Sequence, residues 1–408
     1  MRVSSSTIFD ANVASLTQQQ SRLLHTQQQI STNRRLLTPA DDPTAAAQAL
    51  QVSQADSTNT EYVKNLDVVQ SSTGISEGIL QTVSTVLQDI QTSVLQAGNV
   101  ATLSNSDRKS LASDLQGRLD ELTTLANSKD SVGNYLFSGF QGKTQPFVNT
   151  VAGTQYMGDD GQRLIQVSAN RQLAASDSGA DIFMRIKNGN GTFTTQAAVA
   201  NTGSGIASVG YVVNPAALTG HAYTVKFTSA TTYDVYDTTL DPTMAAAPLS
   251  PGNLYQGGQA VTIANSMQFD IQGSPNTGDQ FTVTPSTTEP VFKTISDLIK
   301  TLNTAVIPGN VASTTQATAS TNTALNGLDR ALDNVLTTRA SLGARLNEVD
   351  SLKTTGTDLG IQYKQVLSQL QDVDYNKAIS DLTQQQTMLQ AAQKSFLQIQ
   401  NLSVFNYM

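Results

Sequence analysis

The sequence predicts a mainly α-helical protein with a β-rich insert. Both chain ends build a long helical bundle or coiled coil, and the insert forms an outer β domain. Three observations predict this class. Heptad patterns occupy both ends of the chain, and proline is absent from residues 44–145 and 309–408. Eight of the 11 prolines lie between residues 146 and 290, with most of the Phe and Tyr residues. Long helices exclude proline, whereas short strands and turns use it.

The N-terminal helix is predicted from a seven-residue repeat and should end near Asn33. Its apolar positions are Phe9, Leu16, Leu23 and Ile30. The positions four residues after the first three are Val13, Gln20 and Gln27. Together they form the a/d seam of a coiled coil.

The C-terminal helix carries a matching seam. Its apolar positions are Tyr375, Leu382, Leu389 and Phe396. The positions four residues later are Ile379, Gln386, Gln393 and Gln400. At ~1.5 Å rise per residue each helix is about 45 Å long. We expect the two ends to pair with each other or with copies of themselves. In an alternative seam, Ala392 and Ile399 face the partner and the glutamines are exposed.

The loop after the first helix carries charges and a helix start signal. Asp42 is predicted to cap the second helix, because a carboxylate accepts free N–H groups and Pro43 fits the first helical position. Arg34 and Arg35 either pair with Asp41 or Asp42 or are solvated; a surface pair would contribute little.

Between this loop and the insert, the pattern predicts a helix from residue 44 to about 97. A third helix starts at a capping signal, Ser106-Asp107, and ends near Asn127. The aromatic segment Tyr135–Phe140, flanked by glycine, predicts a hairpin strand.

Residues 150–290 alternate in short apolar bursts separated by turn residues, which predicts β-structure with one buried face. The bursts include 223–227, 233–236, 267–271 and 281–283. Helix returns at Pro290, with Phe292, Ile295, Leu298, Ile299 and Leu302 on one face. Residues 312–323 are loop or exposed helix, and a second leucine seam follows. A bend is expected at residues 372–375. We therefore predict three domains: 1–40 with 370–408, 41–149 with 290–369, and 150–289.

Composition excludes several functions. The chain has no cysteine, only two histidines (His25 and His221) and a net charge of −8, which disfavours disulfides, thiolate metal sites and nucleic-acid binding. No apolar run is long enough to span a bilayer, and the start lacks the apolar core of a cleaved secretion signal. No catalytic motif, cofactor-binding motif or calcium loop occurs. An enzyme is therefore not expected.

Several motifs give the chain a family resemblance. They are Ile30–Arg35 followed by Pro39–Pro43, Tyr135–Phe140, Arg339–Leu346 and Asp374-Tyr375, with weaker matches at Gly158–Gly161 and Gly278–Phe281. On these residues the chain resembles the bacterial flagellar axial proteins related to flagellin. Its ending, Gln400–Tyr407, is more similar to the hook–filament junction proteins of that family than to flagellins. Asn33 stands where the family often has glycine, and Asn tolerates left-handed backbone angles.

The resemblance implies a structural subunit at the junction between hook-side proteins and the flagellin filament. Its end helices would form the inner layer of a helical tube of copies, and the insert would face solvent. The implied partners are copies of the chain, a hook-side junction protein, flagellin and a cytoplasmic chaperone on the C-terminal helix. Export would use the flagellar type III apparatus without a cleaved signal, so the protein would be extracellular.

Two alternatives stay open: a flagellin that forms the filament itself, and a surface-binding module carried on the insert. A further hypothesis concerns the seam glutamines, since isolated helices rarely repay their ordering entropy. We expect residues 1–33 and 374–408 to be mobile in the free monomer and to order on assembly.

Overall fold

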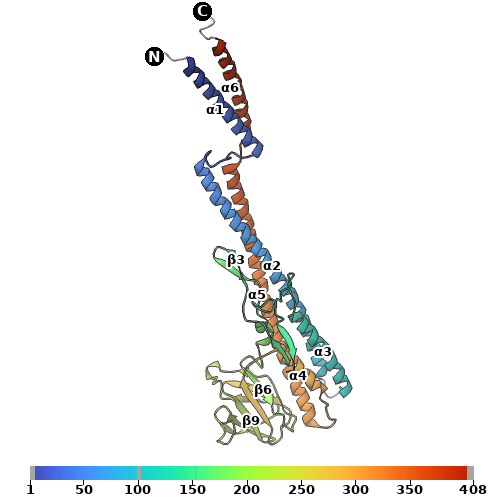
Figure 1. The fold of residues 1–408 in the computed structure, drawn as a ribbon. Helices are drawn as coiled ribbons and strands as arrows, with labels where there is room; N and C mark the ends of the chain where they lie inside the picture. The colour runs from blue at the N-terminus through green and yellow to red at the C-terminus, as the bar shows by residue number, and fades with distance from the viewer. Residues whose placement is uncertain (1–4, 99–102, 152, 402–408) are drawn as a thin grey trace, which may run out of the picture. The chain divides into compact units, whose positions relative to one another are not determined.

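The computed structural model describes residues 5–98, 103–151 and 153–401, which contain six α-helices and 15 β-strands (Figure 1). The helices are α1 (Ser5–Thr32), α2 (Pro43–Ala97), α3 (Asn105–Ala126), α4 (Val291–Asn303), α5 (Val311–Gln371) and α6 (Tyr375–Asn401). All 15 strands lie between α3 and α4 in the sequence. The predicted fold class, mainly α-helical with a β-rich insert, is confirmed.

The chain divides into two compact units. Unit 1 comprises residues 1–66, 167–169 and 350–408, and unit 2 comprises residues 67–166 and 170–349. Unit 1 therefore contains α1, α6 and the adjoining ends of α2 and α5. Unit 2 contains α3, α4, the other parts of α2 and α5, and nearly all of the strands. The three-domain division stays a prediction.

The two longest helices follow the predicted pattern. Helix α2 begins at Pro43, directly after the predicted cap Asp42, and continues through Gly74 and Gly78. Residues 312–323, for which loop and helix were both open, belong to α5. Thr321 within this segment is buried, and its hydroxyl donates to the Ala317 carbonyl one turn earlier at 2.8 Å.

The helical core of unit 2 is built from one face of each of its helices. In α4 the buried residues are Val291, Phe292, Ile295, Leu298, Ile299 and Leu302, and all but Val291 lie on the face predicted from the sequence. In α5 the second seam buries Leu328, Val335, Leu342 and Val349. Leucines of α3 and apolar residues of α2 complete this core. Because each helix buries only one stripe, none of them is stable without the others.

Helix α3 starts two residues earlier than predicted. Its N-cap is Ser104, whose hydroxyl accepts the backbone N–H of Asp107 at 3.2 Å, and Asp107 in turn accepts the Ser104 N–H. This reciprocal pair is a capping box, with Asp107 three residues after the cap. The predicted capping signal, Ser106-Asp107, therefore contains the last residue of the capping box and not its N-cap, which is Ser104.

The hairpin strand predicted at Tyr135–Phe140 is wrong. Tyr135 and Ser138 form only isolated bridges, to Lys129 and Ser178. The backbone N–H of Tyr135 donates to Gly142 and that of Leu136 to Ser128, so successive residues bond to separate segments. The segment is aromatic because Leu136 and the Phe137 ring are buried in the helical core, not because it belongs to a sheet.

The strands are short and antiparallel. They are β1 (Phe147–Thr150), β2 (Gly153–Tyr156), β3 (Leu164–Ser168), β4 (Arg171–Ala174), β5 (Ile186–Lys187), β6 (Phe193–Ala197), β7 (Ile206–Ala207), β8 (Tyr211–Val212), β9 (Tyr223–Ser229), β10 (Thr232–Asp237), β11 (Ser250–Leu254), β12 (Ala260–Ile263), β13 (Met267–Gln272), β14 (Gln280–Pro285) and β15 (Thr288–Glu289). A π-helical turn, η1 (Ala180–Met184), and a 3-10 turn, η2 (Pro215–Ala217), interrupt them.

Two sheets form the part of the insert between β6 and β14. The first has the order β11-β10-β9-β14-β6, and the second has the order β12-β13-β7, with β8 also paired to β13. The four predicted bursts correspond to β9, β10, β13 and β14. Their alternating residues bury one face in a separate core that includes Phe227, Phe269 and Phe281. Period-two patterning therefore located these four strands correctly.

A narrow neck joins these sheets to the rest of unit 2. Strand β5 on the way in pairs with β15 on the way out, with Ile186 opposite Glu289. Just beyond it, the Asn188 N–H donates to the Thr287 carbonyl at 3.0 Å, and the Ser286 hydroxyl donates to the Asn188 carbonyl at 2.7 Å. The insert thus leaves and returns at one place.

Candidate assembly surface

The two end helices of the chain pair with each other within unit 1. Helices α1 and α6 lie side by side in Figure 1 and make extensive contacts. The rings of Phe9 and Phe396 are 5.4 Å apart, and the Tyr375 hydroxyl donates to the Ile30 carbonyl at 3.4 Å. Phe9 and Tyr375 each lie near the start of their helix. The pair is therefore antiparallel, and the same number of residues separates the two contacts in each helix.

The apolar positions predicted every seven residues face the partner over most of the pair. Leu16, Leu23 and Ile30 of α1 are partly buried, as are Leu382, Leu389 and Phe396 of α6. The end positions are more open: Phe9 is 44% exposed and Tyr375 is 46% exposed. Counting inward from the two end contacts places Leu16 opposite Leu389 and Leu23 opposite Leu382.

The second set of seam positions differs from the four-residue spacing. The residues four after the apolar positions are exposed: Val13, Gln20, Gln27, Ile379, Gln386 and Gln393. The residues three after them are shielded instead: Asn12, Gln19 and Thr26 in α1, and Ala378, Gln385 and Ala392 in α6. Both spacings fit a seven-residue repeat, so periodicity alone does not separate them. The small side chains of Ala378 and Ala392 favour the observed face, because they let the helices approach closely.

The alternative seam considered from the sequence, in which Ala392 faces the partner helix, is thus the observed one at Ala392. The side chain of its second member, Ile399, and that of Gln400 lie outside the described side chains.

The loop between α1 and α2 joins three helix ends through hydrogen bonds. The Arg35 guanidinium donates to the Leu370 carbonyl at the end of α5 at 2.8 Å, and it lies 3.5 Å from the Asp42 carboxylate. Asp42 accepts the Ala45 N–H at 3.0 Å, which makes it the cap of α2. The Arg35 N–H also donates to the Gln371 carbonyl at 2.6 Å. Of the pairings left open for Arg35, the structure has the one with Asp42.

Asn33, Arg34 and Asp41 complete this loop. Asn33 has a φ of 56°, in the left-handed region that Asn tolerates, and it redirects the chain after α1. Arg34 forms a backbone bridge with Asp372. Asp41 accepts the N–H groups of Leu37 and Thr38 and the Nε2 of His25 of α1, the last at 3.0 Å.

These contacts change the acidity of both carboxylates. The Thr38 N–H bond is the largest cause that holds the pKa of Asp41 below its usual value, and the Leu37 N–H and His25 add to it. The pKa of Asp42 is lowered chiefly by the Ala45 N–H, then by the Thr44 hydroxyl. Each group is thereby held in its charged, hydrogen-accepting form.

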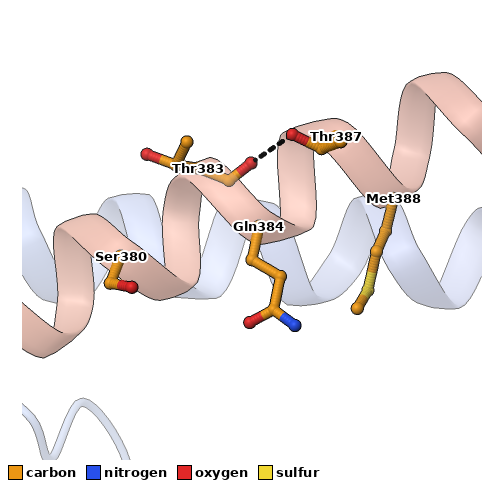
Figure 2. A pocket seen from close by; sticks show the side chains of 5 residues that line it. All are labelled: Ser380, Thr383, Gln384, Thr387 and Met388. Atoms are coloured by element: carbon orange, nitrogen blue, oxygen red, sulfur yellow. Dashed lines mark hydrogen bonds between the residues drawn. The ribbon is translucent and has the colours of Figure 1, made fainter.

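An open groove lies on the outer side of α6, opposite the face that contacts α1 (Figure 2). Ser380, Thr383, Gln384, Thr387 and Met388 line its volume of about 650 Å³, and all belong to α6. The Thr387 hydroxyl donates to the Thr383 carbonyl at 2.9 Å. None of these side chains titrates near neutral pH, and a single helix face cannot enclose a small molecule. The groove therefore fits a neighbouring protein surface better than a substrate.

No group of metal-ligating side chains gathers anywhere in the described part of the chain. None of its helices has an apolar stretch that could cross a membrane.

Sequence reasoning missed the residues that complete the pair and the loop. In the seam these are Asn12, Gln19, Thr26, Ala378 and Gln385. In the loop they are His25 and Gln29, whose side-chain amide donates to the Arg35 carbonyl at 2.7 Å. The alanines carried a usable signal, because Ala378 and Ala392 lie two heptads apart on one face of α6. His25 carried none, since its partner Asp41 follows a turn of unpredictable geometry.

Comparisons with known proteins agree with this architecture. Residues 3–142 match the bacterial flagellin N-terminal helical region, and residues 325–408 match the bacterial flagellin C-terminal helical region. Flagellar hook-associated protein 3 of Escherichia coli is 30% identical over 405 residues, which cover 99% of each chain.

Two solved structures are similar over most of the chain. FlgL of Xanthomonas campestris has 28% identity and a TM-score of 0.71, covering 78% of this chain and 99% of that one. The flagellar junction protein FlgL of Legionella pneumophila has 30% identity and a TM-score of 0.69, covering 80% of this chain and 100% of that one.

The helical ends, their antiparallel pairing and the β-rich insert define a structural protein of the flagellin family, to which this chain belongs. Within that family it is a member of the flagellar hook-associated protein 3 group, and it is a structural subunit of the flagellar junction.

Proposed function

We propose that the chain assembles with copies of itself into a ring, located outside the cell between a hook-side junction protein and the flagellin filament. The α1–α6 pair would supply the inner contacts of this ring. The observation that supports the proposal most is the apolar surface that the pair leaves uncovered.

This surface is unusual for a free helix pair. Leu24, Ile379, Met388 and Leu397 are each half or more exposed, although they belong to helices that already have a partner. The two helices together carry few charges, namely Asp10, Arg22, Lys377, Asp381 and Lys394 besides His25. Exposed apolar side chains with few charges around them are typical of a protein–protein contact. Neighbouring helices of the same composition would cover it.

The site residues then have two roles. Phe9, Leu16, Leu23, Ile30, Leu382, Leu389 and Phe396 would pair the helices, while Val13, Tyr375 and Ile379, being exposed, would contact neighbouring subunits. Arg34, Arg35, Asp41, Asp42 and Pro43 would set the direction of α1 and α6 relative to the adjoining ends of α2 and α5. A catalytic role is not proposed.

Substitution in the seam tests this role. Leu389→Asp places a charge between the two helices, which costs several kcal/mol unless the charge reaches water. We expect the variant to be absent from purified flagella while unit 2 keeps its thermal transition. Gln390→Asp, on the exposed side of the same helix turn, is the matched control for a charge on α6. Normal incorporation of Leu389→Asp would contradict assembly through this pair.

Location tests the junction role separately. Immunogold labelling should give one narrow band where hook and filament meet. Labelling along the whole filament would instead identify a filament subunit.

The proposal extends to export. The uncovered surface of α6 would be held by a cytoplasmic chaperone before secretion through the flagellar type III apparatus, without a cleaved signal. We further propose that the pair orders fully only on assembly. Hydrogen exchange of the free protein should then show weak protection in α1 and α6. Protection equal to that of the α4 core would refute this part.

A further inference from the structure

The α1–α6 seam alternates between apolar and polar layers. The layers of large apolar or aromatic residues are Phe9/Phe396, Leu16/Leu389, Leu23/Leu382 and Ile30/Tyr375. The layers between them hold Asn12 with Ala392, Gln19 with Gln385 and Thr26 with Ala378. Only one of these layers has a long polar side chain on both helices. That layer is Gln19 with Gln385, at the middle of the pair.

The two amides of this layer are shielded but lack partners. The Oε1 atoms of Gln19 and Gln385 are buried, and neither accepts a hydrogen bond from the described residues. The Nδ2 of Asn12, two layers away, is likewise buried without an acceptor in the described part of the chain. By contrast, the Thr26 hydroxyl donates to the Arg22 carbonyl of its own helix at 3.1 Å and needs nothing from α6.

Polar atoms in such a seam reduce its stability, because a buried carbonyl without a donor costs free energy that leucine would not. They also distinguish one alignment of the helices from others. Rotation of one amide turns its NH₂ group towards the other amide's oxygen, and this is possible only where two amides share a layer. A single polar layer is known to fix register in coiled coils in this way.

We propose that Gln19 and Gln385 determine the specificity of the terminal pairing, selecting one antiparallel register of α1 against α6. A slip of one heptad that brings Leu16 opposite Phe396 would move Gln19 opposite Ala392 and Gln385 opposite Thr26, so that no layer holds two amides. The opposite slip would place Gln385 opposite Asn12 and Gln19 opposite Ala378. The apolar layers do not resist such a slip, because leucine would again meet leucine or another large apolar residue. Within the seam, the amide layer makes the first of these slips unfavourable. This inference deepens the proposed assembly role, and its test uses the free protein.

The chain has no cysteine, so introduced cysteine pairs report register directly. Phe9→Cys with Phe396→Cys samples the observed register, in which the two rings are 5.4 Å apart. Leu16→Cys with Phe396→Cys samples a slip of one heptad that leaves no layer with two amides; in the observed register these positions are about 10 Å apart. A disulfide requires Cα atoms within about 7 Å, so each pair reports one register.

In the otherwise native chain, we expect the first pair to oxidise about tenfold faster than the second. Adding Gln19→Leu and Gln385→Leu should bring the two rates within about threefold of each other, because every layer is then apolar or neutral to slipping. Gln20→Leu with Gln386→Leu adds the same two leucines on the exposed side and should keep the tenfold preference.

Equal rates in the native chain would overturn the proposal, as would a preference that survives Gln19→Leu with Gln385→Leu. Loss of preference in the Gln20→Leu, Gln386→Leu control would also overturn it, since added apolarity and not the amide layer would then govern register. These results are independent of whether the protein reaches the hook–filament junction, which the labelling experiment measures.

Discussion

Replacing Phe147 with alanine should unfold unit 2 at a markedly lower temperature. Phe147 is the first residue of β1 and is fully buried, and its ring lies 5.2 Å from that of Phe292 in α4. It also contacts Tyr156 at 5.2 Å and Phe183 at 5.4 Å. One side chain of β1 thus contacts β2, the π-helical turn η1 and the core helix α4. Truncating such a phenylalanine costs roughly 3–5 kcal/mol, because the rigid aromatic neighbours cannot close the cavity.

Thermal unfolding followed by circular dichroism measures this cost. For a unit of this size, 1 kcal/mol corresponds to about 2–4 °C in Tm, so we expect a decrease on the order of 10 °C. Phe140→Ala is the matched control, because Phe140 is 70% exposed and should change stability by no more than about 0.5 kcal/mol. A Phe147→Ala shift as small as that of the control would refute the view that this aromatic cluster holds the insert to the helical body.

Three further predictions concern α5, the loop and α3. Gly356→Ala should destabilise unit 1 by roughly 1–3 kcal/mol, because the new Cβ would lie 2.8 Å from Val63 Cγ2. Gly343 has open space around it, so Gly343→Ala should stabilise unit 2 by up to about 1 kcal/mol, and urea unfolding measures both changes. Acidification should weaken the loop, because the pKa values of Asp41 and Asp42 in the folded protein lie below 3.8. Their stabilisation is therefore complete above the unfolded pKa and is lost as the pH falls through the folded pKa values. Circular dichroism should show this loss in the native chain but not in the double variant Asp41→Asn with Asp42→Asn. Arg108→Met should stabilise unit 2 by about 1–2 kcal/mol, because the buried guanidinium donates to the Thr301 carbonyl while its Nε and Nη1 have no partner among the described residues. An unchanged or lower Tm would contradict this prediction.

The sequence predicted those parts of the fold whose signals are periodic or carried by single residues. Apolar spacing predicted the face of α4, alternation predicted strands β9, β10, β13 and β14, and the Asp-Pro cap predicted the start of α2 at Pro43. Each of these signals reflects a local rule: a helix buries one stripe, a strand buries alternate residues, and proline fits the first helical turn.

The predictions failed where two sets of seam positions have the same seven-residue period, or where contacts with residues distant in the sequence determine the local structure. Positions three and four residues after Leu382 repeat equally well, so only packing against α1 selects Gln385 over Gln386. The segment around Phe137 looks like a strand, but its neighbours are helices and loops distant in the sequence. The partner of Arg35 at Leu370 is more than 300 residues away in the chain, and no local pattern announces it.

The neck formed by β5 and β15 has a consequence for how this chain can change over time. Because the insert enters and leaves through one hydrogen-bonded pair of strands, the segment between Asn188 and Ser286 begins and ends at adjacent positions. A longer, shorter or unrelated domain spliced between these two residues would leave the helices on either side with the same partners, apart from the bond that the Arg330 guanidinium of α5 donates to the Gly189 carbonyl at 3.2 Å. The insert can therefore vary in sequence and size without changing α1 and α6, the helices through which we propose that the protein assembles.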